Sequence, residues 1–509
     1  MSAPDGVGSL KKRARREGFR YQMELNFGQK EDKDHFLARL DRVKGSLATK
    51  RRRPVDNMEL LSHLLDLAEK EESEVQSQDT SSSSAMLNTS GIYAGDGDEE
   101  QPLFVCEVSA FEDLVLGMTR WCTCGMVNRK MISYRQSGHV IRAEFQCQSC
   151  NRKEWWASSS LLGSRYLINQ KLIHAFTCAG MLPSQYYHFC RLASLGTVGK
   201  RYTDSVYNSK GYVAAIESCA EASMTKAIDE IKATSEYETD GEWVITDARH
   251  DSTANAYHTT VPCLSGSIHK IVGCVTLSRK EHTCAQTREL ACTKEVLPLV
   301  MSKGLNVTEV AHDNSPSVTS YIVEELQLKN SYDTWHGTKN VAKAMTSIAT
   351  GTKKRAGITW YPELSDKRKS TKTHLYYSMK NCNKSPENLR DSITNIVDHY
   401  RGKHSNCNQS SSCRRPGYAP SKKLITDPNA VEAYTRKLKQ TLIYVNAESY
   451  CSCQDTFWVE SFNHHLLTYL PKRIHFGTTT FRMRMNIAVM DWNENVERPH
   501  TSERYIFDI

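Results

Sequence analysis

Two stretches, WVITD at residues 243–247 and VTEVAHD at residues 307–313, follow the same pattern. Each is a short run rich in β-branched residues that ends in an aspartate, Asp247 in the first and Asp313 in the second. Runs of this length and composition predict strands buried in a sheet. Both aspartates are therefore expected at strand ends, directly before a turn.

Further elements are predicted between and after these stretches. The runs at 256–261 and 270–277 predict two more strands, which follow the first in close succession. Residues 289–301 then predict a helix, and Pro316 opens a second helix that continues to about residue 326. Strand, strand, strand, helix, strand, helix is the order of the RNase H fold. The predicted fold class is therefore α/β multidomain, with an RNase H-like core.

Three carboxylates are candidates for one catalytic centre. Asp247 and Asp313 emerge at the same edge of the sheet if the first and fourth strands are neighbours, and Glu460 lies in an amphipathic helix over 455–466. Mg²⁺ prefers oxygen ligands, and two such ions stabilise the attacking and leaving oxygens of phosphodiester cleavage. The sequence predicts two Mg²⁺ ions here, with Mn²⁺ as a substitute. Asp251 competes with Asp247 as the first ligand, and we prefer Asp247 because the strand ends there.

Cations follow the predicted Glu460 helix. They are Lys472, Arg473, Arg482 and Arg484. Lysine and arginine side chains next to a nuclease site are well placed to hold DNA phosphates. We therefore predict double-stranded DNA as the partner of this region.

Two groups of cysteine and histidine predict structural zinc. Cys122, Cys124, Cys147 and Cys150 flank strand-like runs at 132–134 and 140–145, an arrangement typical of a tetrahedral zinc ribbon. A second group is formed by His399, His404, Cys407 and Cys413. Cys451 and Cys453 are alternative contributors, so the ligand set of the second site stays open.

The length of 509 residues and the net charge of +8 predict two or more domains and permit a polyanionic partner. No apolar run approaches a membrane span, and basic runs at 11–16 and 50–54 suit nuclear import, so a soluble nuclear protein is expected. The predicted parts are a basic, partly helical N-terminal module (1–69), a disordered acidic and serine-rich linker (70–102), a zinc-ribbon module (103–159), a helical domain for DNA binding or dimerisation (160–240), the first part of the RNase H-like core (241–340), a helical insertion with the second zinc site (341–450) and the last part of the core with the Glu460 helix (451–509).

Five blocks of this sequence carry a family resemblance. They are ITDARHDS at 245–252, AHDN at 311–314, DTWHGTK at 333–339, ESFN through YLPKR at 460–473, and MDWNEN at 490–495. In this order they resemble DDE transposases of the Kolobok type, over roughly residues 103–500. One departure is Asn463, where we expect a histidine.

The resemblance implies a nuclear cut-and-paste enzyme that acts on terminal inverted repeats and inserts at TTAA. It implies that Asp247, Asp313 and Glu460 are the acidic triad and that His336 is a conformational or near-site residue. The long interval between Asp313 and Glu460 would hold a mainly helical insertion. Pairing of two transposon ends implies at least a homodimer.

Three functions compete. In a transposase, water attacks the scissile phosphate at the element end, and the freed 3′-hydroxyl then attacks target DNA at the same Mg²⁺-dependent site. The main alternative is a domesticated transposase without activity that works as a sequence-specific nuclear DNA-binding protein. A structure-selective nuclease without strand transfer is the weaker third reading. The intact triad favours an enzyme.

Overall fold

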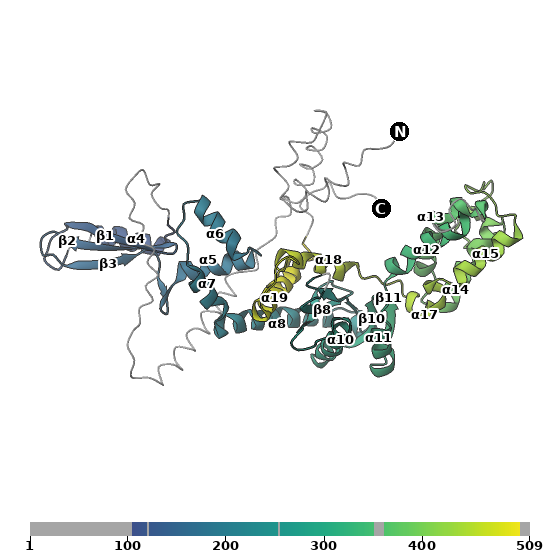
Figure 1. The fold of residues 1–509 in the computed structure, drawn as a ribbon, viewed down its shortest axis with the longest axis horizontal. Helices are drawn as coiled ribbons and strands as arrows, with labels where there is room; N and C mark the ends of the chain where they lie inside the picture. Colours follow the sequence, from purple (N-terminus) through teal and green to yellow (C-terminus); the bar gives the residue numbers. More distant parts are fainter. Residues whose placement is uncertain (1–103, 120–121, 253–254, 351–360, 499–509) are drawn as a thin grey trace, which may run out of the picture. The chain divides into compact units, whose positions relative to one another are not determined.

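The computed structural model describes residues 104–119, 122–252, 255–350 and 361–498 (Figure 1). These residues form a mixed α/β protein with one large mixed sheet and many helices. The N-terminal module and the linker predicted over 1–69 and 70–102 lie outside the described residues. Among the described helices, none combines the length and the apolarity that a bilayer crossing requires.

The first described elements are a helix and a three-stranded antiparallel sheet. They are α4 (Val108–Thr119), β1 (Arg129–Ser137), β2 (Val140–Cys147) and β3 (Lys153–Ala157), with strand order β1-β2-β3. The strand-like runs predicted at 132–134 and 140–145 lie in β1 and β2. The third strand, β3, was not predicted, although its Trp156 contributes a hydrogen bond to the Ala110 carbonyl on α4 (2.8 Å).

Helices dominate the next segment, as the apolar spacing predicts. A small hairpin comes first, followed by the helices: β4 (Leu161–Leu162), β5 (Arg165–Tyr166), α5 (Leu167–Cys178), α6 (Pro183–Leu192), α7 (Lys200–Tyr207), α8 (Lys210–Lys232) and α9 (Tyr237–Asp240). Pro183 occupies the first turn of α6, where its missing N–H costs no helical hydrogen bond. Phe176 of α5 stacks on Tyr186 of α6, with 4.5 Å between ring centroids.

The central sheet has six strands. They are β6 (Glu242–Thr246), β7 (Arg249–His250), β8 (His258–Ser265), β9 (Ile271–Ser278), β10 (Val307–His312) and β11 (Lys329–Tyr332). The strand order is β11-β10-β6-β8, with β9 pairing along β8 and the short β7 also pairing with β8. The pairs β6–β8 and β8–β9 are antiparallel, whereas β10 is parallel to both β6 and β11. The first and fourth strands, β6 and β10, are thus neighbours, which is the condition under which Asp247 and Asp313 emerge at one edge.

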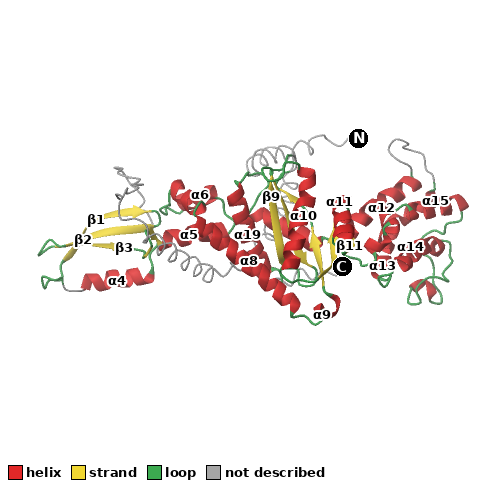
Figure 2. Cartoon of the chain, turned by 90° about the horizontal axis from the view of Figure 1, so that it is seen from below, coloured by secondary structure: helices red, strands yellow, loops and turns green. Residues whose placement is uncertain are grey.

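Helices cover both faces of this sheet (Figure 2). The covering helices are α10 (Ala285–Ser302) on one face, and α18 (Phe457–His465) and α19 (Thr478–Asn495) on the other, while α8 contributes residues to both cores. Neighbouring residues of β6 separate into two cores, because side chains alternate along a strand. Val244 lies in the core that contains α10, and Ile245 lies in the core that contains α18. Burial on both faces explains why these strands are continuous apolar runs in the sequence.

The long interval between β10 and α18 is mostly helical. It contains α11 (Pro316–Ser320), a π-helical turn (Tyr321–Glu325), α12 (Thr334–Ala349), α13 (Arg368–Lys380), α14 (Pro386–Tyr400), α15 (Pro428–Lys439), α16 (Leu442–Val445) and α17 (Ala447–Tyr450), with 3₁₀ turns at Pro362–Lys367, Ser412–Arg414 and, after α18, Leu466–Thr468. The helices α12 to α17 share a core of their own. This insertion leaves and rejoins the sheet at adjacent points, because the Thr334 amide donates to the Gln454 carbonyl (3.2 Å).

Candidate active site and metal centres

Asp247 and Asp313 occupy equivalent positions on two neighbouring parallel strands. Ile245 of β6 is paired with Ala311 of β10. Asp247 comes two residues after Ile245, and Asp313 comes two residues after Ala311. Parallel strands end at the same edge of a sheet, so both carboxylates emerge there. Ile245 and Ala311 belong to the core shared with α18, so alternation directs both aspartates toward the α18 side.

Glu460 lies on α18, and a hydrogen bond joins this helix to Asp247. The Nδ2 atom of Asn463 donates to Oδ2 of Asp247 at 2.8 Å. Residues three apart on a helix share one face, so Glu460 lies on the face that Asn463 directs toward β6. Glu460 is exposed, which leaves its carboxylate accessible to a ligand. The structure thus brings the three predicted acids to one sheet edge.

Asp333 joins the start of α12 to the start of α18. Its side chain is only 3% exposed, and it accepts hydrogen bonds from the backbone N of His336 (2.6 Å), from Nδ1 of the same histidine (2.7 Å) and from the Thr456 amide (3.1 Å). His336 Nδ1 also lies 3.3 Å from Oδ1 of Asp313. Asp313, Asp333 and His336 form one group with the ligand types of a metal site.

Sequence reasoning placed Asp333 in the block at 333–339 but gave a role only to His336. The available signal was its position directly before Thr-Trp-His at the start of a helix, since aspartate is a preferred N-cap residue. The local sequence gives no sign of the other hydrogen bond of Asp333, which comes from the Thr456 amide. The Thr456 amide lies 123 residues further along the chain.

The carboxyl groups of the site repel one another. Burial, followed by the charge of Asp313, raises the pKa of Asp247 to about 7, against the hydrogen bond from Asn463. Burial also raises the pKa of Asp313 and that of Glu460, and His336 opposes both shifts. Glu289 of α10, a further acid that sequence reasoning missed, adds to the negative field at Asp247. A cation among these groups would relieve the repulsion.

The carboxylate of Asp251, the competing first ligand, accepts hydrogen bonds from residues that follow it in the chain. Its Oδ1 accepts from the Tyr257 amide (2.9 Å), and its Oδ2 accepts from the His258 amide (2.8 Å) and lies 3.0 Å from His258 Nδ1. Although burial opposes them, the hydrogen bonds from His258 and Tyr257 hold the pKa of Asp251 below its usual value. These hydrogen bonds hold the segment that leads into β8. Because the oxygens of Asp251 are already used in this way, the geometry favours Asp247 as the ligand.

The four cations predicted to contact DNA are in different environments. Lys472 and Arg473 are exposed in the segment between α18 and α19. Arg482 is exposed and donates to Oε1 of Glu281 (2.5 Å). The prediction for Arg484 needs correction, because its side chain is fully buried and donates to the carbonyls of Tyr469 (3.2 Å) and Met181 (2.7 Å). A buried guanidinium with protein acceptors cannot reach a phosphate, and Arg484 instead holds α19 to its neighbours.

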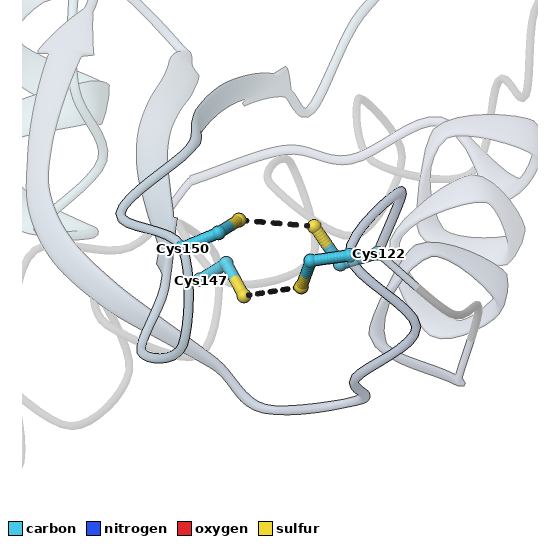
Figure 3. A group of neighbouring side chains, drawn as sticks. Cys122, Cys147 and Cys150 are labelled. Atoms are coloured by element: carbon cyan, nitrogen blue, oxygen red, sulfur yellow. Dashed lines mark hydrogen bonds between the residues drawn. The ribbon is translucent and has the colours of Figure 1, made fainter.

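The first zinc group is assembled as the cysteine spacing predicts. Sγ atoms of Cys122 and Cys150 lie 3.6 Å apart, and those of Cys124 and Cys147 lie 3.7 Å apart. Figure 3 shows the thiols of two facing turns directed toward a common centre. With Zn–S bonds of about 2.3 Å, a regular tetrahedron has S–S edges of about 3.8 Å. Both distances are close to this edge, and all four sulfurs lie within 4.8 Å of one another, so the group can accommodate a tetrahedral Cys₄ zinc site.

Two backbone turns hold these cysteines. Gly125 adopts a φ of 82° and donates its N–H to the Cys122 carbonyl (2.7 Å), a conformation that favours glycine. Asn151, with φ 60°, donates its N–H to the carbonyl of Cys147, four residues earlier (2.9 Å). Backbone N–H groups of Cys150 and Ser149 lower the pKa of Cys147, which favours the thiolate that zinc requires.

The second metal group lies in the insertion. Ligand atoms of His399, His404, Cys407 and Cys413 all lie within 4.8 Å of one another. The Cys407 sulfur is 3.6 Å from Nδ1 of His399 and 3.8 Å from Nδ1 of His404. Two histidines and two cysteines at these distances can bind zinc. Cys451 and Cys453, the alternative contributors, instead pack in or against the core of the insertion.

Part of the chain is similar to a known protein family. Residues 276–413 match the model of a family described as Mutator-like transposase. The matched segment contains Asp313, His336 and the second metal group, whereas Asp247 and Glu460 lie outside it. No curated protein matches the chain. The match supports a transposase family, which implies a DNA-processing enzyme that binds DNA, and it does not bear on the Kolobok type.

Proposed function

We propose that this chain is a DDE transposase that cleaves DNA at the ends of a mobile element and joins those ends to target DNA. The observation that carries the proposal is the meeting of Asp247, Asp313 and Glu460 at one sheet edge, with α18 held against Asp247 by Asn463. The match to a transposase family over residues 276–413 supports it independently.

We further propose that the core is RNase H-like. In chain order, the five main strands of the sheet lie side by side as third, second, first, fourth and fifth. The first three are antiparallel and the last two run parallel to the first. This is the arrangement of an RNase H sheet, and it supports the fold class predicted from the order of strands and helices.

The donor set fits two Mg²⁺ ions. All three predicted ligands are carboxylates, which hard cations prefer. After burial, the charge of Asp313 raises the pKa of Asp247 and that of Glu460, and Glu460 adds to the shift of Asp247. When bound, two Mg²⁺ ions would stabilise the attacking and leaving oxygens of an in-line displacement, with Mn²⁺ as a substitute. Asp247, Asp313 and Glu460 would hold the ions. His336, held by Asp333, orients the Asp313 carboxylate, and Asn463 orients that of Asp247.

The chemistry has two displacements. In the first, the oxygen of water forms a bond to the scissile phosphorus and the bond from phosphorus to the 3′-oxygen breaks; one proton of the water passes to that 3′-oxygen, which leaves as a hydroxyl, and the other proton is released. In the second, that 3′-hydroxyl attacks a phosphate of target DNA: a new phosphodiester bond forms, the bond to the 3′-oxygen of the target strand breaks, and that oxygen leaves as a hydroxyl with the proton given up by the attacking group. Lys472 and Arg473, both exposed after α18, are placed to hold phosphates of the duplex.

Several finer assignments rest on the sequence. The Kolobok resemblance and its TTAA target, the nuclear location suggested by the basic runs, and a dimer that pairs two ends belong to this proposal. A catalytically idle DNA-binding protein is the second candidate function, favoured by the cysteine ribbon and its exposed cations.

One experiment separates these candidates. The full chain is incubated with Mg²⁺ and labelled duplex DNA that carries the element's terminal inverted repeat, beside the Asp313→Ala variant. Nicking and joining products that only the unsubstituted protein forms support a transposase, whereas nicking without joining supports a nuclease. Binding of both proteins without nicking by either would overturn the proposal and favour the idle DNA-binding protein.

A further inference from the structure

The sheet β1-β2-β3 has one covered face and one open face. The helix α4 lies against the covered face, where Trp156 donates to the Ala110 carbonyl and Arg129 donates to the Gly117 carbonyl (2.9 Å) (Figure 2). Residues directly opposite one another in a sheet share a face, and alternate residues along each strand follow them. By the strand register, the open face carries Lys130, Ser133, Arg135, Arg142, Glu144, Gln146, Lys153 and Trp155.

This open face is strongly cationic. It has four cations, Lys130, Arg135, Arg142 and Lys153, against one acid, Glu144. Glu144 is already paired with Lys153, at 3.3 Å from its Nζ atom. The remaining three cations form no ion pair with any residue that the structure describes.

Two of these cations lie opposite each other, where they do not stabilise the sheet. Arg135 of β1 and Arg142 of β2 are direct cross-strand partners. Like charges directly opposite each other destabilise a strand pair, and neither arginine forms an ion pair with a described acid, since the neighbouring Glu144 is paired with Lys153. An external anion would convert this repulsion into a binding site.

An aromatic side chain fixes the orientation of Arg142. Its guanidinium carbon lies 4.3 Å from the centroid of the Trp155 ring, and Trp155 remains 46% exposed. Stacking on an indole holds the planar guanidinium while its N–H groups stay free for hydrogen bonds. Less side-chain entropy is then lost when a phosphate binds.

We infer that this open face binds the phosphate backbone of double-stranded DNA. Its cations are distributed over all three strands, which presents a broad charged surface to the dense phosphates of a duplex. Single-strand binding proteins rely instead on aromatic platforms for successive bases. This face has one aromatic residue, and Arg142 already occupies part of it. The inference rests on the proposed function for the choice of duplex DNA.

The salt dependence of binding tests this inference. Each phosphate contact contributes about 0.9 to the slope of log K against log salt concentration for duplex DNA. The full chain, without Mg²⁺ so that cleavage does not proceed, is titrated onto a short fluorescent duplex at several salt concentrations. We expect Arg135→Gln with Arg142→Gln to reduce the slope by about 1.8, and Lys130→Gln alone to reduce it by about 0.9.

Arg436→Gln with Lys439→Gln is the matched control, because both cations are exposed on α15, far along the chain from the ribbon. The control should leave the slope unchanged, and zinc content should stay equal in all variants. An unchanged slope in the ribbon variants, no binding to duplex DNA by the full chain, or an effect on single strands alone would overturn the inference. Loss of nicking in the Asp313→Ala comparison is a separate readout, so either proposal can fail without the other.

Discussion

Asn463 on α18 donates a 2.8 Å hydrogen bond from Nδ2 to Oδ2 of Asp247, across 216 residues of sequence. This bond sets the distance between the helix of Glu460 and the strand end of Asp247. Asn463 stands where the sequence resemblance leads us to expect a histidine. A histidine and an asparagine can both donate a side-chain N–H to a carboxylate.

Two substitutions of Asn463 test whether the hydrogen bond to Asp247, rather than the asparagine itself, is needed for catalysis. Asn463→Leu removes the donor, and we expect single-turnover nicking to slow by about 10–100-fold, the usual cost of removing a partner that orients a metal ligand. Asn463→His restores a donor and should recover most of the rate. Equal rates for the leucine and histidine variants would show that the bond to Asp247 has no catalytic role.

Asp333 is expected to act by positioning rather than by contact with DNA. Asp333→Ala leaves the Thr456 amide and His336 without their acceptor. We expect kcat for nicking to fall while KM for DNA is little changed, with faster hydrogen exchange at the Thr456 amide. Asp333→Asn keeps one acceptor oxygen and should give an intermediate kcat. A change in KM alone would contradict a positioning role.

Much of the central sheet could be predicted because its strands are apolar runs of characteristic length. The fourth strand was expected at residues 307–312 and is observed there as β10. The second was expected at 256–261 but spans 258–265, because the hydrogen bonds of Asp251 hold residues 257 and 258 at its start. The helix expected at 289–301 is observed as α10, which begins earlier, at Ala285, and continues past Pro298 to Ser302.

The position of Glu460 could not be derived from local sequence. Spacing carries no information across an insertion that folds around its own core and returns beside its starting point. The contacts that fix α18 join residues far apart, as Asp333 does with Thr456. The burial of Arg484 was missed for a related reason, since its carbonyl acceptors come from Met181 and Tyr469 in other segments. The Cys₄ group was predictable because its cysteines come from two short turns, Cys122 and Cys124 from one and Cys147 and Cys150 from the other, and such turns are visible in the local sequence.

Asp251 should affect stability rather than chemistry. Asp251→Ala removes an acceptor from the Tyr257 and His258 amides, and we expect a loss of about 1–3 kcal/mol in the free energy of unfolding at neutral pH. The pKa of Asp251 is lowered in the folded protein, so its contribution is present above the unfolded value of about 3.9 and is lost as pH falls further. Denaturant unfolding at neutral and acidic pH measures the difference.

The nicking rate per folded molecule should be unaffected by the same Asp251 variant. If Asp251→Ala instead abolished nicking without lowering stability, Asp251 and not Asp247 would be the first ligand of the site.

Metal analysis should find two zinc ions in each chain. Cys147→Ser should remove the ion of the ribbon, and Cys407→Ser should remove the ion of the insertion, so each variant retains one. Elemental analysis of purified protein gives the stoichiometry directly. One zinc ion in the unsubstituted protein, unaffected by Cys407→Ser, would mean that the second group is a packed cluster of side chains.

The most direct test of the catalytic centre compares its three acids in one assay. Single-turnover nicking of inverted-repeat DNA with Mg²⁺ is measured for Asp247→Asn, Asp313→Asn and Glu460→Gln, with Glu295→Gln on the exposed surface of α10 as the control. We predict that each of the three slows nicking by about a thousandfold, equivalent to about 4 kcal/mol, and that the control has the unsubstituted rate. Nicking at the unsubstituted rate by any one of the three variants would contradict a shared catalytic centre.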